Sequence, residues 1–193
     1  MHECVKFIIM NKSDILKKDW KDQLKGSPKM MLETIQQLVD DEIQEISRMG
    51  QGATIQLGGV QASAVKFQLN SKRILRGISI FGSQNENQNL DVVIKVFNDV
   101  KTLLYEETLK FKSRGYPFRP HQLLFTKSVP IEANEVYHMT TNVPGGQTYY
   151  GQNFKQVVNF EDPGKGSSKV TFSNSHHGNG DVGLVPDFYF SKG

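Results

Sequence analysis

Cysteine and tryptophan are nearly absent from the chain: its 193 residues contain one of each, Cys4 and Trp20. A single cysteine cannot form an intramolecular disulfide, which excludes the small secreted proteins that disulfides hold together. No stretch approaches the ~18 consecutive apolar residues that a membrane-spanning helix needs. Near the first residue, acidic Glu3 and the charge of Lys6 do not fit the basic start and apolar core of a secretory signal. We therefore expect a cytoplasmic protein without membrane partners.

A strong excess of one charge is also lacking. Lysine and arginine number 23 and aspartate and glutamate 20, which gives a formal net charge of +3. The basic residues are scattered along the chain, and no run of them covers one face of an expected element. Proteins that bind nucleic acid concentrate basic charge in a patch or stripe. We therefore expect no nucleic-acid partner.

Aromatic residues and glycine are rare up to Gly50 and common after it. The first fifty residues contain two aromatic residues and two glycines, whereas the remainder contains seventeen and fifteen. The first part is rich in residues that favour helices, and the second in Val, Ile, Phe, Tyr and Thr between turn residues, which favours strands. We place a domain boundary here, with a helical segment over 1–50 and a β domain over 51–193.

Within the first part, the segment 27–50, "SPKMMLETIQQLVDDEIQEISRMG", predicts one helix with both ends marked. Ser27 suits the N-cap, Pro28 suits the first helical position, and Gly50 suits the end. An apolar residue recurs every three or four positions, at Met31, Ile35, Leu38, Val39, Ile43 and Ile46. Shorter helices are expected over 2–11 and 13–26. Helices of this size bury little surface alone, so they either pack on the β domain or form the end of a helical domain.

The second part predicts about ten short strands with turn residues between them. In "AVKFQL", Val65, Phe67 and Leu69 alternate with polar residues, as expected of a strand with one buried face. The expected strands are 53–59, 64–70, 74–82, 90–98, 101–112, 121–129, 134–142, 154–160, 168–174 and 184–190. No helical pattern separates them. The fold class is therefore mainly β, an antiparallel, jelly-roll-like β-sandwich after a short helical segment, with a closed barrel as the alternative.

Residues that could carry catalysis or hold a metal do not form a recognisable set. His176 and His177 precede Asp181, but neighbouring side chains in an extended loop point apart, so we interpret this stretch as a solvated turn. Glu106 and Glu107 are adjacent on a predicted strand and so face opposite ways. No serine has the context of a nucleophile elbow. We expect no enzymatic activity, no cofactor and no metal.

Two stretches combine exposed-type aromatic residues with polar ones. In "TTNVPGGQTYYGQNF" (140–154), Tyr149 and Tyr150 straddle the two faces of a strand beside Gln147, which would suit a protein-binding surface. The alternative is that both tyrosines are structural, with one hydroxyl bonded to a neighbouring corner. In "RGYPFRP" (114–120) the candidate contact residues are Tyr116, Phe118 and Arg119, and the alternative is a plain extended connection.

Taken together, the strand segments resemble a PHR domain, the β-sandwich module of Pam/Highwire/RPM-1 proteins and of certain BTB-domain proteins. The resemblance lies in four segments, in the family's order. These are "AVKFQLNSKRILRGISIFGS", with Ile80–Phe81–Gly82; "LLFTKSVPIEANEVYHMTTNV", with Tyr137; "YYGQNFKQVV", with Tyr150, Gly151 and Val157; and "GNGDVGLVPDFYF", with Gly183 and Pro186. The last segment is then the closing turn and final strand of the sandwich.

The residues before the β domain resemble the helices that follow a BTB domain in cullin-linked adaptors, through "CVKFI", Trp20 and Pro28. The two resemblances together imply a module that recognises a protein partner or substrate for a cullin-based ubiquitin ligase. A BTB region, which this chain lacks, would contact the cullin. Two alternatives stay open: a structural subunit of a larger, for example cytoskeletal, assembly, and a glycan-binding jelly roll.

Overall fold

The computed structural model describes residues 43–51, 53–58, 62–115, 120–144, 148–162, 166–174 and 183–193. The chain divides into two compact units, Met1–Glu42 and Ile43–Gly193, and all described residues belong to the second. The helices expected over 2–11 and 13–26, and most of the helix over 27–50, lie outside the described residues. Across these described ranges, no helix is long and apolar enough to cross a membrane.

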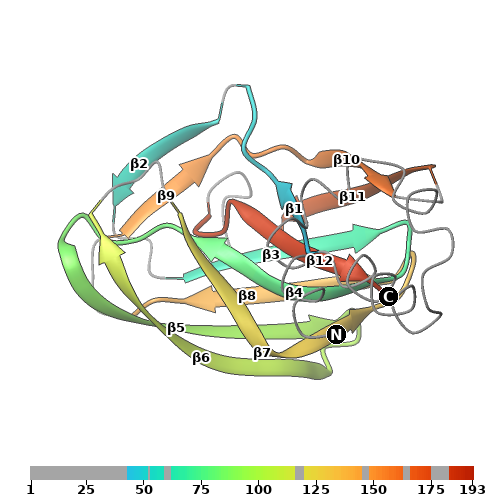
Figure 1. Ribbon diagram of the computed structural model, residues 1–193, viewed down its shortest axis with the longest axis horizontal. Helices are drawn as coiled ribbons and strands as arrows, with labels where there is room; N and C mark the ends of the chain where they lie inside the picture. The colour runs from blue at the N-terminus through green and yellow to red at the C-terminus, as the bar shows by residue number, and fades with distance from the viewer. Residues whose placement is uncertain are drawn as a thin grey trace, which may run out of the picture. The chain divides into compact units, whose positions relative to one another are not determined.

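The described unit consists of antiparallel strands in two main sheets and a small ribbon (Figure 1). The smaller sheet has the order β1 (Gln44–Ser47), β12 (Asp187–Lys192), β4 (Arg73–Ile80), β7 (His121–Ile131). The larger sheet has the order β10 (Val157–Asp162), β11 (Gly166–Asn174), β3 (Ala62–Leu69), β8 (Val136–Asn142), β5 (Glu86–Asn98), β6 (Leu103–Arg114). The ribbon pairs β2 (Thr54–Gly58) with β9 (Thr148–Gln152). This confirms the mainly β class and the sandwich, rather than the barrel.

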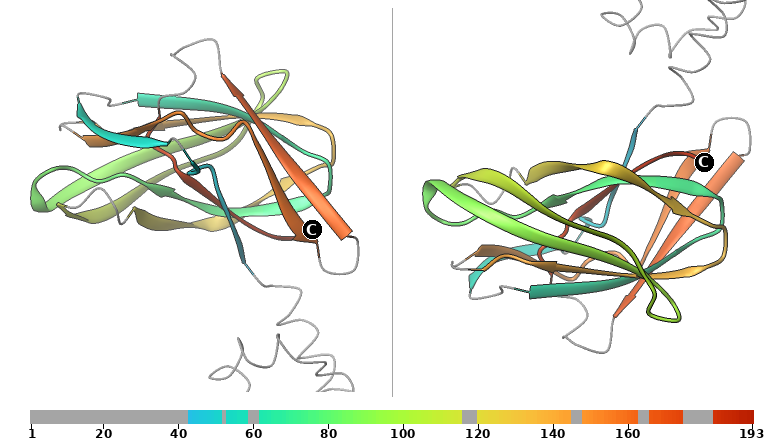
Figure 2. Two further views of the ribbon diagram at one scale, coloured as in Figure 1. Left: turned by 90° about the horizontal axis from the view of Figure 1, so that it is seen from above. Right: turned by 90° about the horizontal axis from the view of Figure 1, so that it is seen from below.

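The two main sheets lie one over the other, and their facing side chains form a single core (Figure 2). On β3, Val65, Phe67 and Leu69 are buried, as their alternation predicts. The Phe67 ring lies 5.4 Å from the ring of Phe188 on β12, centroid to centroid, so the larger sheet contacts the smaller one directly. Full burial of apolar side chains of this size stabilises the fold by about 1.5–3 kcal/mol each.

β1 corrects the sequence analysis, which placed residues 43–50 at the end of a helix. Gln44–Ser47 is instead a strand that pairs with β12, with Ile46 opposite Phe188. Ile46 is 2% exposed and belongs to the core. Because Glu45 and Ser47 flank one buried isoleucine, this short stretch also fits an alternating strand, and pairing with β12 overrides the helical spacing. The β unit therefore begins before Gly50.

One open side of the sandwich is closed where β6 and β7, the edges of the two main sheets, meet. The rings of Tyr105 and Phe125 stack with centroids 4.6 Å apart. The Thr126 amide donates to the Glu107 carboxylate over 3.1 Å, and the Tyr105 hydroxyl donates to the same carboxylate. Burial raises the pKa of the Tyr105 hydroxyl, and its bond to Glu107 raises it further. Aromatic stacking and a shared carboxylate thus hold the two edges together.

A junction of three segments that are distant in sequence fixes the other end of the core. The Tyr149 amide donates to the Gly82 carbonyl over 2.9 Å, and Gly151 and Gly183 exchange backbone hydrogen bonds of 2.9 and 3.0 Å. The Phe81 amide donates to the Leu184 carbonyl over 3.0 Å. The junction therefore unites the end of β4, the strand β9 and the turn before β12, which are three of the four segments that carry the family resemblance.

Arg48 attaches the end of β1 to this junction. Its side chain is 6% exposed, and its Nη1 donates to the Val185 carbonyl over 3.1 Å. The guanidinium lies 4.3 Å from the centroid of the Phe154 ring and 5.1 Å from that of Phe172. Its backbone accepts from Lys155 and donates to Pro186. The aromatic faces and the carbonyl oxygen offset part of the hydration that this buried cation loses.

Gly151 is expected to accommodate a side chain poorly, because the aromatic rings of Phe154 and Phe81 fill the space beside it. A Cβ at this position would lie 2.3 Å from Cζ of Phe154 and 3.2 Å from Cε2 of Phe81. We predict that Gly151→Ala lowers the free energy of unfolding by about 1–3 kcal/mol, the usual cost of overpacking. Gly183→Ala is the matched control, since its Cβ would be no closer than 3.0 Å to Ser63 Oγ. Urea unfolding of both variants measures the difference, and equal losses would contradict this account.

Candidate functional site

Tyr149 and Tyr150, the predicted binding residues, lie on β9 and are both partly buried. Tyr150 packs over the ribbon: a Cβ at Gly58 would lie 2.6 Å from its Cε1, so the ring covers the glycine. Its hydroxyl donates to Oε1 of Gln56 over 2.9 Å, and the ring contacts the core. Tyr149 lies directly opposite Leu57, which is 40% exposed. Both tyrosines are thus half-buried, and a binding role for either residue stays a prediction.

The other predicted contact residues, Gln147, Tyr116, Phe118 and Arg119, lie outside the described residues, as do His176 and His177. The corner tyrosine of this sandwich is Tyr137 on β8. Its hydroxyl accepts a 2.9 Å hydrogen bond from the Glu132 amide. This bond ties β8 to the turn that precedes it, which is the structural role considered for the β9 tyrosines.

Two substitutions of Tyr150 separate the contribution of its hydroxyl to stability from that of its ring. We predict that Tyr150→Phe costs under about 1 kcal/mol of unfolding free energy, because an exposed hydrogen bond is lost. We predict that Tyr150→Ala costs about 2 kcal/mol, because Gly58 and part of the core lose their cover. Thermal unfolding of the two variants gives the comparison. Equal costs would mean that the ring does not support the ribbon.

A cleft that the sequence analysis did not find lies between the β5–β6 turn and the β7–β8 turn. Its volume is about 420 Å³. The residues that line it are Asn98, Leu104, Ser128, Val129, Pro130, Glu132, Glu135 and Tyr137. Buried Val129 and Tyr137 form its floor, and the other lining residues, which are exposed except for half-buried Asn98, form its rim. The cleft thus offers an apolar bottom with polar groups around it, as pockets for ligand side chains usually do.

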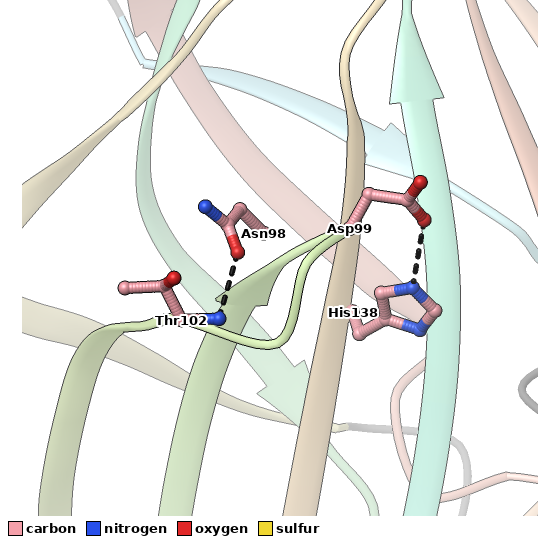
Figure 3. Close-up of polar contacts among 4 residues, drawn as sticks. All are labelled: Asn98, Asp99, Thr102 and His138. Carbon is pink, nitrogen blue, oxygen red and sulfur yellow. Dashed lines mark hydrogen bonds and ion pairs between the residues drawn. The ribbon is translucent and has the colours of Figure 1, made fainter.

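The β5–β6 turn beside the cleft is held by its own hydrogen bonds. The Thr102 amide donates to Oδ1 of Asn98 over 2.7 Å, and Lys101, at φ 63°, donates its amide to the Asn98 carbonyl over 3.0 Å. Nε2 of His138 lies 3.4 Å from Oδ1 of Asp99, so the turn also contacts the neighbouring strand β8 (Figure 3). Surface pairs of this kind contribute little energy, but they restrict the turn's orientation.

This turn presents apolar side chains to solvent. Val100 is 79% exposed, Leu103 46% and Leu104 44%. A β-bulge between Val96 and Phe97 breaks the regular register of β5 with β6 here, and bulges redirect side chains. The sequence did contain a signal, because adjacent leucines on a strand cannot both face the core. We use the term turn surface for Val100, Leu103 and Leu104 together with the residues that line the cleft.

The rim of the cleft is acidic. Glu132 pairs with Lys72 over 2.8 Å, and both side chains are about half exposed. Glu135 makes no ion pair with any described residue. The turn surface therefore combines exposed leucines with one carboxylate available to a basic group of a ligand.

Buried titratable groups elsewhere have structural partners. The Ser79 hydroxyl on β4 donates to the Asp187 carboxylate on β12, and both are buried. Burial raises the pKa of the neighbouring Tyr189, and the carboxylates of Glu45 and Asp187 raise it further. Among the residues that the structure describes, no group of three or more His, Cys, Asp or Glu side chains could hold a metal ion. The absence of enzymatic activity stays a prediction.

His121 is a buried histidine at the start of β7. It is 7% exposed, its Nε2 accepts from the Arg114 amide over 3.3 Å, and its ring lies 4.7 Å from that of Phe111. Burial lowers the pKa of its imidazole, and the charge of Arg114 lowers it further. In the unfolded chain the imidazole regains its ordinary pKa of about 6.5. Below that pH the unfolded state binds the proton more readily, so stability falls until the folded imidazole also titrates.

We predict that His121→Gln removes part of the stability loss on acidification from pH 7 to pH 5. Glutamine keeps an acceptor near the position of Nε2 but does not titrate. Urea unfolding of wild type and variant across this range measures the effect. A variant curve that runs parallel to the wild-type curve would show that His121 does not contribute.

The PHR domain family model matches residues 48–191, which is about three quarters of the chain. The chain belongs to the PHR domain family. The match includes both tyrosines of β9 and the entire turn surface of this PHR domain. It does not reach the segment that resembles the helices after a BTB domain, and that segment lies before the described residues.

No curated protein matches the chain. Solved structures similar to it include infectious bursal disease virus of the Gt strain, with 8% identity, a TM-score of 0.30 and coverage of 78% of this chain and 37% of that one. The structure of the Gx strain has 10% identity and a TM-score of 0.30, and the match covers 78% of this chain and 36% of the viral chain. The VP2 subviral particle of the same virus has 12% identity and a TM-score of 0.30, and the match covers 78% of this chain and 41% of the viral chain. The chain spans less than half of each viral chain.

Proposed function

We propose that this PHR domain captures a partner protein in the cytoplasm and presents it to a cullin-based ubiquitin ligase. The domain's family and its β-sandwich support an interaction or structural module. The turn surface carries the more specific part of the proposal, because exposed Leu104 lines a cleft with an apolar floor and exposed Val100 and Leu103 lie on the adjoining turn. The ligase setting rests on the resemblance to BTB–PHR adaptors.

The turn surface has the properties of a protein contact. Apolar side chains on a turn held by hydrogen bonds lose little entropy when a partner covers them. The floor of Val129 and Tyr137 provides a pocket of the kind in which anchor residues concentrate binding energy. Glu135 at the rim would favour a partner segment that places a basic side chain beside its apolar anchor.

We predict that Leu104→Asp weakens partner capture at least tenfold, because it removes an apolar contact and adds a charge of the same sign as Glu135. Leu124→Asp is the matched control: Leu124 is 48% exposed against 44% for Leu104 and lies on β7 of the smaller sheet. The full chain and both variants would be compared by quantitative affinity purification from cells and then by calorimetry with the recovered partner. Retention of the partner by Leu104→Asp, or its equal loss in both variants, would contradict the proposal.

The ligase part has a separate test. Ubiquitylation of the captured partner in cells should rise with expression of this protein and fall when cullins are inactivated. If capture persists but ubiquitylation does not depend on cullins, the capture function stands and the ligase setting is wrong. Copurification at a fixed stoichiometry without ubiquitylation would favour a structural subunit instead.

A further inference from the structure

The backbone of β2 has an open edge, and the bonds of β9 identify which residues face it. In an antiparallel pair, each residue directs both its N–H and its C=O to one side. Tyr149 and Gly151 donate their amides to Gly82 and Gly183, and so away from β2. Their direct partners on β2, Leu57 and Ile55, therefore direct their backbone groups away from β9 as well.

Ile55 and Leu57 have no backbone hydrogen bond to any described residue on this outer side. β9 lies beside β2 on its other side, and β2 is the outer strand of the ribbon (Figure 1). The N–H and C=O groups of Ile55 and Leu57 therefore offer two donors and two acceptors at the spacing of a β ladder. Gln56, between them, is bonded to Tyr150 and fixes that spacing.

The usual protection of an edge strand is missing from β2. Edge strands normally carry lysine, proline or a bulge that prevents another strand from adding to them. Residues 49–65 contain no Asp, Glu, Lys, Arg or Pro, and the pairing of β2 with β9 runs without a register shift. Leu57, at 40% exposure, adds an apolar side chain beside the open backbone.

We propose that the open edge of β2 binds an extended, uncharged segment of a partner protein by strand addition. The proposal rests on the proposed capture function but uses a surface different from the turn surface. One face of the ribbon bears Ile55, Leu57 and Tyr149, and the other bears Thr54, Gln56 and the Tyr150 hydroxyl. The segment therefore alternates apolar residues with small polar or amide residues, and charge is excluded because none is present to complement it.

The occupant is a peptide segment rather than a second copy of the chain. β2 is five residues long. Pairing of two such strands buries far less than the about 1,000 Å² that a stable interface between folded domains needs. A flexible segment is not limited in this way, because its side chains can also fold over both faces of the ribbon.

The test uses the full chain and a displayed library of random nine-residue peptides. Peptides enriched on the wild-type chain are synthesised, and their affinity is measured by calorimetry. Amide hydrogen exchange is followed by NMR in the free chain and with each peptide. We expect fast exchange of the Ile55 and Leu57 amides in the free chain and at least tenfold slower exchange in the complex, with Gln56 protected in both.

Leu57→Pro removes one outward-facing donor without breaking a bond to β9, because proline is tolerated where the N–H of an edge strand faces solvent. We expect it to weaken peptide binding at least tenfold and to leave the melting temperature nearly unchanged. Leu57→Ala, which keeps the donor, should weaken binding less. Leu57→Lys provides a second variant with an intact backbone, and it should also reduce binding.

Support for the proposal requires an enriched peptide that slows amide exchange at Ile55 and Leu57 and that binds more weakly to Leu57→Pro. The proposal is overturned if no peptide meets both conditions. It is also overturned if these amides become protected without peptide as the chain dimerises, since a second copy then fills the edge. If the enriched peptides are lost on Leu104→Asp instead, they bind the turn surface, so the capture function stands and the edge proposal fails. The opposite result is also distinguishable. If peptides bind the β2 edge but capture of cellular partners is unchanged by Leu104→Asp, the edge proposal stands and the turn surface is not the capture site.

Discussion

The close approach of Gly151 and Gly183 is the constraint on which the architecture of this domain depends. Reciprocal backbone bonds of 2.9 and 3.0 Å join them, and the space where a side chain of Gly151 would lie is filled by the rings of Phe154 and Phe81. This contact places β9 against the end of β4 and against the turn that leads into β12. The closing strand then brings Phe188 and Phe190 into the core. Two glycines and two aromatic residues therefore connect the ribbon to the smaller main sheet, which contains β4 and β12.

The same constraint determines which surfaces are open. Tyr149 and Gly151 of β9 direct their backbone groups to Gly82 and Gly183, and the alternate residues of β9 pair with β2. No strand among the described residues pairs with the other edge of β2. The turn surface lies far from this edge. β5 begins after Ser83, which bridges to Thr148 of β9, and runs for thirteen residues before it reaches Asn98. At about 3.3 Å per residue, this strand separates the two surfaces by roughly 40 Å.

The sequence predicts the strands well where one face is buried. It predicts them poorly where contacts with distant segments determine whether a stretch becomes a helix or a strand. Val65, Phe67 and Leu69 on β3 are buried, as their alternation predicts. Ile46 fits a helical stripe and a short strand equally, and only its pairing with Phe188 decides between them. The cleft was not predictable, because it is lined by residues near two turns that are distant in sequence. The tyrosines of β9 were found as unusual residues, but their partners Gly58 and Leu57 lie about ninety residues away.

The separation of the two surfaces limits how a partner can use both. An extended segment of at least about twelve residues is needed to span roughly 40 Å, at up to 3.3–3.6 Å per residue. A single short motif would therefore reach only one of the two proposed sites, the turn surface with its acidic rim or the uncharged β2 edge. A partner with two suitable segments on a longer flexible linker would convert its second contact into an intramolecular one, with an effective concentration in the millimolar range for linkers that match the span. Two individually weak contacts of different chemistry would then select a partner more stringently than either alone, because a competitor would have to match an apolar–basic segment and a neutral strand at the correct spacing.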